Sequence, residues 1–111
     1  MNLNDEFPLL SSAFITPTET LLQQTEQAVE AANAAIYRRS EAATAYLADR
    51  NDATRDAWLD AVIHERSADK ALEALRAAAK AYRALLPEAA REYWDARSTD
   101  RLGTREALAL R

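Results

Sequence analysis

The chain has 111 residues, a formal net charge of −4 and no cysteine. This length suits one domain with a modest core, and the lack of cysteine excludes disulfides, a thiolate nucleophile and cysteine-bound metal ions. The composition includes 26 alanines but only one glycine and three prolines. Because alanine is the best helix former and glycine and proline are the worst, the composition predicts an all-α protein.

Residues 1–15 are predicted to form an apolar N-terminal arm. The apolar residues of this segment, taken together, follow no helical period, and Pro8 and the pair Ser11 and Ser12 disfavour a long helix at this point. The apolar residues are Phe7, Pro8, Leu9, Leu10, Phe14 and Ile15. Two interpretations are open: the arm covers apolar surface on the rest of the chain, or it is a docking segment for a partner. The first is favoured, because exposed apolar patches are rare on soluble monomers.

The first long helix is predicted over about residues 17–49, within a helical domain of residues 16–111. Thr16 is placed at the N-cap, Pro17 in the first turn, and Glu19 three residues after the cap. This order is typical of a capping box. An apolar row then recurs every seven residues, which predicts a stripe that packs against another helix. It consists of Leu22, Val29, Ile36 and Ala43; Leu21, Ala28, Ala35 and Ala42 repeat beside it in the same stripe, and Ala32 and Tyr46 fill its other edge.

A second long helix is predicted over about residues 53–86. Arg50, Asn51 and Asp52 interrupt the pattern, and Asn and Asp prefer caps and turns to helix interiors. The heptad row that follows is out of phase with the first, which favours a reversal near Asn51 over one continuous rod. That row contains Trp58, Leu72, Ala79 and Leu86. The prediction is therefore a long antiparallel helical hairpin.

The charges at the two helix ends favour the same antiparallel arrangement. A reversal at Asn51 brings the acidic start of the first helix beside the basic end of the second, so that opposite signs meet. The acidic residues are Glu19, Glu26 and Glu30, and the basic residues are Arg76, Lys80 and Arg83.

A short third helix is predicted over about residues 88–101, followed by a last turn at 105–110. Pro87 separates this helix from the second, and Gly103 is expected to close it. An alanine-rich hairpin buries little area, so a further layer must cover it. Either the short helix completes a three-helix domain, or two hairpins pair into a dimeric four-helix bundle.

Residues that could support catalysis or metal binding are few. His64 is the single histidine, and with Asp56 and Asp60 it forms only a row on one side of a helix, which is typical of a solvated acidic face. Glu65 falls on the predicted apolar row and is interpreted as a polar residue that fixes register. No nucleophile or phosphate-loop motif is present. We therefore predict no enzyme activity, no cofactor and no metal site.

Protein binding is the function that the sequence favours. Tryptophan and tyrosine are enriched at interface hot spots, and the competing interpretation of both tryptophans is core packing. The candidate partner-binding residues are Tyr93, Trp94, Trp58, Phe7, Leu10 and Phe14.

The leading hypothesis is a non-enzymatic interaction module that acts as an adaptor, chaperone or assembly factor for a protein partner, with a homodimer as one option. The alternatives are a small phage- or mobile-element-encoded inhibitor that occludes a host complex, and a nucleic-acid-associated accessory protein. The low isoelectric point of about 5.0 disfavours nucleic acid. No membrane segment and a cytoplasmic location are expected.

Overall fold

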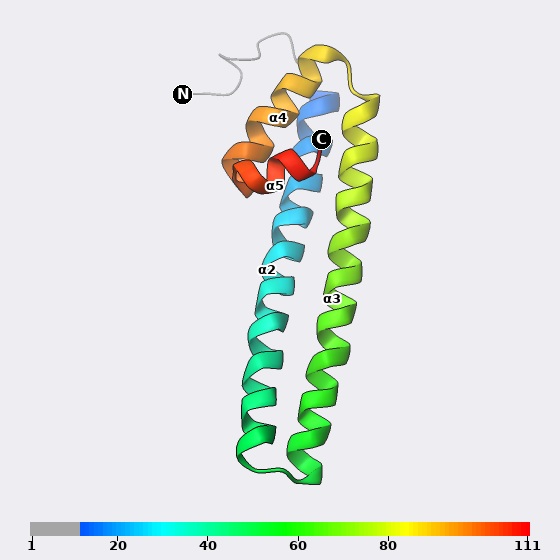
Figure 1. The fold of residues 1–111 in the computed structure, drawn as a ribbon. Helices are drawn as coiled ribbons and strands as arrows, with labels where there is room; N and C mark the ends of the chain where they lie inside the picture. The colour runs from blue at the N-terminus through cyan, green and yellow to red at the C-terminus, as the bar shows by residue number, and fades with distance from the viewer. Residues whose placement is uncertain (1–11) are drawn as a thin grey trace. The chain divides into compact units, whose positions relative to one another are not determined.

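The protein is all-α, as its composition predicts. A computed structural model of the chain describes residues 12–111, and four helices hold almost all of them (Figure 1). These are α2 (Ser12–Ala48), α3 (Asp52–Leu85), α4 (Glu88–Leu102) and α5 (Thr104–Ala109). The long antiparallel hairpin and the short third helix are therefore confirmed. Among the described residues, no helix is long and apolar enough to cross a membrane.

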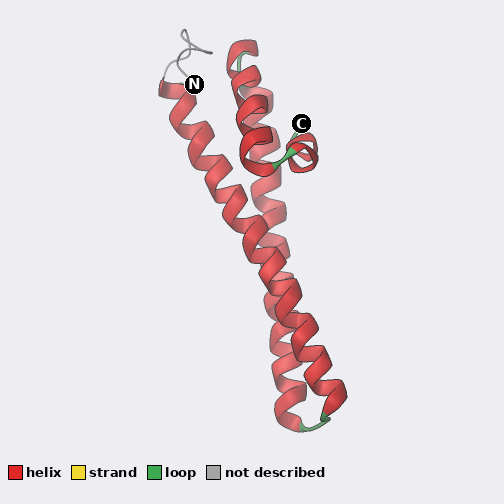
Figure 2. Cartoon of the chain, turned by 90° about the vertical axis from the view of Figure 1, so that its left-hand side faces the viewer, coloured by secondary structure: helices red, strands yellow, loops and turns green. Residues whose placement is uncertain are grey.

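The reversal between α2 and α3 occurs at Asn51, where the sequence predicts it (Figure 2). The Thr54 amide donates to the Asn51 side-chain oxygen at 3.0 Å, and the Asn51 amide donates to the Thr54 hydroxyl at 3.1 Å. The same hydroxyl donates to the Asp49 carbonyl at 2.7 Å. This reciprocal capping satisfies amides that the first turn of α3 cannot bond internally, so the turn forms without glycine or proline.

The Asn51 cap makes a measurable contribution to stability. Asn51→Ala should lower the free energy of unfolding by about 0.5–2 kcal/mol, because it leaves the Thr54 amide in the first turn of α3 without its acceptor. Urea unfolding followed by circular dichroism measures the change. Gln24→Ala, in the exposed interior of α2, is the matched control and should be neutral or slightly stabilising. An equal loss in both variants would contradict the role of the cap.

Two compact units divide the chain. Unit 1 comprises residues 1–26 and 75–111, and unit 2 comprises residues 27–74. Unit 2 is a two-helix hairpin whose contact row, called the seam here, is rich in alanine. Every seam residue is buried or half-buried: Ala28, Ala32, Ala35, Arg39, Ala42 and Tyr46 on α2, and Thr54, Trp58, Ala61, Glu65, Ala68 and Leu72 on α3.

The seam differs in one respect from the predicted apolar row on the first helix. Ala32 and Ala35 are buried, whereas Ile36 of the predicted row is 41 % exposed. Two side-chain contacts fix the register of the hairpin: Arg39 pairs with Glu65, and the rings of Tyr46 and Trp58 stack at 5.8 Å. The prediction that Glu65 is a register-setting polar residue is consistent with the first of these contacts.

Unit 1 contains the larger core of the molecule. The ends of α2 and α3 pack there with α4 and α5 around six buried residues, Leu22, Ala79, Leu86, Ala90, Trp94 and Leu110. Phe14, Leu21, Tyr82 and Leu102 pack against this core. The Tyr82 and Trp94 rings lie 5.6 Å apart at a tilt of 57°, within the range that favours aromatic pairs.

The predicted start of the first helix is wrong. Helix α2 begins at Ser12, so Thr16 is not its N-cap and Pro17 lies inside it. Residues 12–15 therefore belong to the helix and not to an apolar arm. Phe14 packs, partly buried, on the core of unit 1, and this burial of apolar surface opposes the cost of proline within a helix.

The two later breaks fall where the sequence predicts them. Helix α3 ends at Leu85, and Pro87 precedes the first residue of α4. Gly103 ends α4 with φ of 86°, and its amide donates to the Thr99 carbonyl. A side chain at this φ is strained, so glycine permits the turn into α5. Helix α5 occupies the segment in which a last turn is predicted.

Candidate functional surfaces

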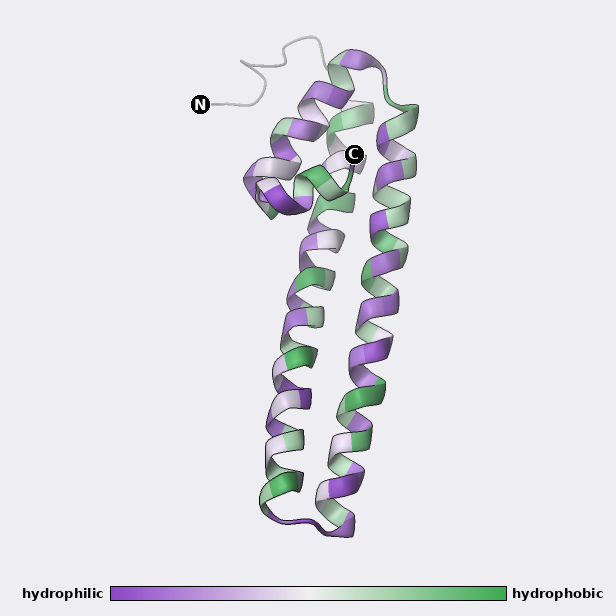
Figure 3. Cartoon of the chain, viewed as in Figure 1, coloured by the Kyte–Doolittle hydropathy of each residue, from purple (hydrophilic) through white to green (hydrophobic). Residues whose placement is uncertain are grey.

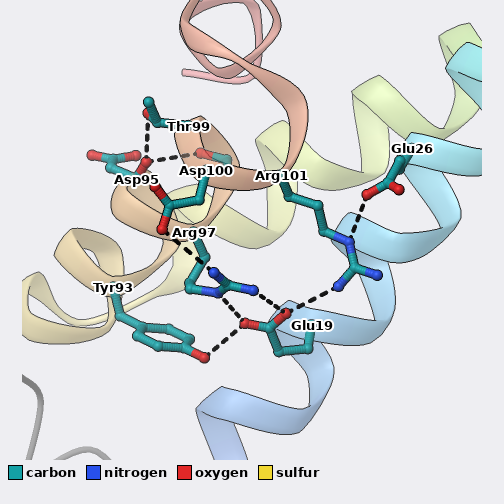
Figure 4. A network of polar contacts seen from close by, with 9 residues as sticks. Glu19, Glu26, Tyr93, Asp95, Arg97, Thr99, Asp100 and Arg101 are labelled. Atoms are coloured by element: carbon teal, nitrogen blue, oxygen red, sulfur yellow. Dashed lines mark hydrogen bonds and ion pairs between the residues drawn. The ribbon is translucent and has the colours of Figure 1, made fainter. Parts of the chain in front are cut away.

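A network of charged and polar side chains joins α2 to α4 in unit 1 (Figure 4). Glu19 lies at its centre and accepts hydrogen bonds from the Tyr93 hydroxyl at 2.8 Å and from Arg97 Nε at 2.6 Å. Arg101 donates to Glu19 at 3.2 Å and to Glu26 at 2.7 Å. Tyr93, Arg97 and Arg101 are spaced by four residues, so they project from one side of α4.

The contacts in this network shift the pKa values of Glu19 and Tyr93. The hydrogen bond from Arg97 lowers the pKa of Glu19 below its ordinary value of 4.5, against the opposing effect of burial. Burial, followed by the hydrogen bond to Glu19, raises the pKa of Tyr93 to about 12. Glu19 is therefore a carboxylate and Tyr93 a neutral hydroxyl donor at neutral pH. A general acid needs the opposite shift, a carboxyl pKa raised toward neutrality.

Two further ion pairs connect α3 to the C-terminal helices in unit 1. Arg83 binds the Asp95 carboxylate through two hydrogen bonds, at 2.8 and 2.9 Å. This contact lowers the pKa of Asp95 from its ordinary value. Arg76 binds Glu106 of α5 in the same two-pronged manner, at 2.7 and 2.9 Å. Such paired geometry makes an arginine–carboxylate contact strong and directional.

The predicted partners of these charges are therefore wrong. The acidic residues at the start of the first helix were expected to face the basic end of the second. Instead, Glu19 and Glu26 bind arginines of α4, and Arg76 and Arg83 bind carboxylates of α5 and α4. The short third helix, α4, supplies both a carboxylate and two arginines to these ion pairs. A prediction that matches only the charges of the two long helices leaves these partners out.

Tyr93 and Trp94 do not form a partner surface in this structure. Both side chains are fully buried, at 0 % exposure, and Trp94 belongs to the core of unit 1. The competing interpretation, core packing, matches the placement of Trp94. Tyr93 instead presents its hydroxyl to Glu19. A side chain without exposed surface is not available to a partner while unit 1 is folded.

The other predicted partner-binding residues have different surroundings. Phe14 is partly buried against the core of unit 1, whereas Phe7 and Leu10 lie outside the described residues. Trp58 is half-buried in unit 2 and stacks on Tyr46 with an interplanar angle of 5°. Arg50 lies 5.8 Å from the centre of the Tyr46 ring, which is cation–π distance. A partner-binding role for Trp58 stays a prediction.

Unit 2 exposes most of the large apolar side chains that the described residues leave in solvent. Ile36, Tyr37, Leu47, Leu59 and Ile63 are 41–73 % exposed and lie in unit 2, whereas Leu85 and Leu108 lie in unit 1. Figure 3 shows hydrophobic bands recurring along α2 and α3 among hydrophilic turns. Ile36, Leu47 and Leu59 recur with the three- and four-residue spacing of core positions, so the sequence does not identify them as exposed.

Residues considered for chemistry do not assemble into a site. His64 is exposed, as are Asp56 and Asp60. In residues 12–111, no group of three histidine, cysteine or acidic side chains is arranged to hold a metal ion.

Comparison of the chain with protein-family models, curated proteins and solved structures gives no match.

Proposed function

We propose that the protein is a non-enzymatic interaction module that binds a protein partner through unit 2. The observation that supports this most is the concentration of exposed apolar side chains on the unit 2 hairpin, while unit 1 buries Tyr93 and Trp94. Exposed apolar surface rimmed by polar groups is typical of a protein-binding site. Unit 1, with its core and its ion pairs, serves as the folded support.

The partner surface that we propose is the outer side of α3 around Ile63. Ile63 follows the buried seam residue Ala61 by two residues, so it points about 200° away from the seam and from α2. Tyr37 follows Ala35 in the same way, so it points outward from α2 on the opposite edge of the hairpin. Ile63 is 65 % and Tyr37 is 73 % exposed.

The chemistry around Ile63 indicates what the partner presents. Arg66, Ser67 and Lys70 line a shallow depression together with Ile63. An apolar anchor flanked by two cations fits an amphipathic helix with apolar and acidic side chains. A nucleic-acid partner is less well supported, since Arg76 and Arg83 of the predicted basic row are bound by carboxylates within the chain.

Site-specific photo-crosslinking tests this function. Photoreactive benzoylphenylalanine at Ile63 should give a protein adduct in lysate. The same substitution at Tyr37, on the opposite edge, or at Leu108 in unit 1, which is 55 % exposed, should not give that adduct. The adduct is identified by mass spectrometry. The purified partner should then bind directly, and Ile63→Ala should weaken its binding at least tenfold, whereas Tyr37→Ala should not. Adducts that are identical at all three positions, or unchanged affinity of Ile63→Ala, would exclude this surface.

A further inference from the structure

Each long helix carries a second heptad stripe, one residue later than the seam. Intervals of four and three residues alternate along both stripes without interruption. On α2 the stripe is Ile15, Glu19, Leu22, Glu26, Val29, Asn33, Ile36, Ser40, Ala43 and Leu47. On α3 it is Arg55, Leu59, Val62, Arg66, Asp69, Glu73, Arg76, Lys80 and Arg83. Because the helices are right-handed and antiparallel, the same one-residue shift brings both stripes to the same face of the hairpin.

In unit 1 this second stripe is covered by α4 and α5. Glu19 and Glu26 of the α2 stripe bind Arg97 and Arg101 of α4. Leu22 lies fully buried in the core with Trp94. On the α3 stripe, Arg83 binds Asp95 of α4 and Arg76 binds Glu106 of α5. The stripe is thus a surface on which a second layer of helices packs.

In unit 2 the second stripe continues on both helices, but no helix among the described residues covers it. Ile36, Leu47 and Leu59 are 41 %, 65 % and 45 % exposed. The six α2 stripe residues that fall in unit 2, the first being Val29 and the last Leu47, are all uncharged. The unit 2 parts of the two stripes are called the open face: Val29, Asn33, Ile36, Ser40, Ala43 and Leu47 on α2, and Arg55, Leu59, Val62, Arg66, Asp69 and Glu73 on α3.

We propose that the open face binds the open face of a second copy of this chain, in antiparallel orientation, to form a four-helix bundle. This inference rests on the proposed function and deepens it, because it names one partner of unit 2. It uses the face next to the Ile63 depression, with which it shares Arg66. Two antiparallel helices of matched length are the layer that the open face lacks, and a second hairpin supplies both.

Charge selects the antiparallel orientation. On the α3 part, Arg55 lies near the hairpin turn and Glu73 lies at the other end, whereas Arg66 and Asp69 both lie beyond the midpoint at His64. Antiparallel copies bring Arg55 of each copy opposite Glu73 of the other, and the uncharged α2 parts meet each other. Copies with their turns at the same end would place the charged α3 part against the uncharged α2 part, where desolvation is not compensated.

The register follows from the seam contacts. Arg39 faces Glu65 and Tyr46 faces Trp58, so Ser40 lies level with His64, midway between Arg55 and Glu73. Ser40 therefore falls at the two-fold axis, where its small side chain permits close approach. The α2 part spans about 27 Å and two helices about 20 Å in width. The resulting ~540 Å² per copy is near the lower end of stable interfaces, about 600 Å² per partner.

Sedimentation equilibrium over a range of concentrations tests the association. The wild-type chain should form a concentration-dependent dimer. Leu47→Arg and Ile36→Arg should each weaken it at least tenfold, because both place an unpaired charge against the uncharged α2 part of the second copy. Leu108→Arg, which makes the same change at an exposed leucine of unit 1, should leave it unaltered. A strict monomer, or equal weakening by the control, would overturn the proposal.

Disulfide trapping tests the orientation, since the chain contains no cysteine. Ser40→Cys should oxidise to a covalent dimer, and Asn33→Cys should not, because residues 33 of the two copies would lie two helical turns from the axis on opposite sides. Crosslinking of Asn33→Cys without Ser40→Cys would contradict the register.

A charge swap gives an independent check. Glu73→Arg should weaken the dimer, and the double variant Arg55→Glu, Glu73→Arg should restore it. Failure to restore would contradict the assigned pair. The two proposals fail separately: a monomer that still binds its partner at Ile63 refutes only the dimer, and a dimer without such a partner refutes only the binding module.

Discussion

Trp94→Ala is expected to lower the free energy of unfolding by about 3–5 kcal/mol, the range measured when large aromatic residues are removed from cores. Trp94 has no exposed surface, belongs to the core of unit 1 and contacts the Tyr82 ring. Its removal leaves a cavity bordered by Leu22, among other core residues, that helices fixed by ion pairs cannot fully close. Urea unfolding followed by circular dichroism measures the loss.

Two matched variants separate the causes of this loss. Trp94→Phe should cost much less than Trp94→Ala, because it keeps most of the buried apolar volume and the Trp94 indole nitrogen has no hydrogen-bond partner among the described residues. Trp58→Ala should cost about 1 kcal/mol, since Trp58 is half-buried and stacks on one ring. A Trp94→Ala loss no larger than that of Trp58→Ala would show that Trp94 is not a core residue.

Glu19→Gln is expected to lower the free energy of unfolding by about 1.5–3 kcal/mol at pH 7, the range for hydrogen bonds to charged groups. The Glu19 carboxylate accepts bonds from Tyr93, Arg97 and Arg101, and a neutral amide satisfies these donors poorly. Glu30→Gln, an exposed substitution on the same helix, is the control and should change stability by less than about 0.5 kcal/mol. Equal losses in both variants would contradict the central role of Glu19.

The same network predicts the direction of the pH dependence. Contacts with arginine lower the pKa of Glu19 and of Asp95 in the folded protein. Each carboxylate therefore contributes stability that is fully present above its unfolded pKa and is lost as the pH falls through the folded pKa. The wild-type chain should lose stability below about pH 4.5, and Glu19→Gln should show a shallower loss. Unfolding in urea at pH 7 and at pH 3 distinguishes the two slopes.

The helix boundaries can be predicted from short stretches of sequence, because the residues that start and end each helix act on their immediate neighbours. Asn51 and Thr54 cap α3 with bonds that span three residues. Pro87 lies between α3 and α4, and Gly103 ends α4 at a positive φ. Each of these signals depends on backbone geometry that neighbouring residues set. The start of α2 is the exception, because packing of Phe14 on the core of unit 1 accompanies a helix that extends beyond the predicted cap at Thr16.

The surfaces depend on tertiary structure. Heptad spacing alone does not distinguish the α2 seam from the second stripe, since Ala35 and Ile36 repeat with the same period, yet only Ala35 is buried. Likewise Trp94 is equally compatible with a core and with an interface until α4 is placed against the hairpin ends. The four-residue spacing of Tyr93, Arg97 and Arg101 indicates that they share one side of a helix. Their hydrophilic character, however, predicts that this side faces solvent and not Glu19.

The sequence by itself therefore determined an all-α chain that reverses at Asn51 and breaks at Pro87 and Gly103, because alanine-rich helices, caps and turns obey short-range backbone energetics. Only the tertiary structure decided which stripe of α2 became the seam, which carboxylates Arg97 and Arg101 bind, and that Tyr93 and Trp94 are buried. Those outcomes depend on where α4 docks, and docking sums many contacts between residues more than 70 positions apart, which no local pattern encodes.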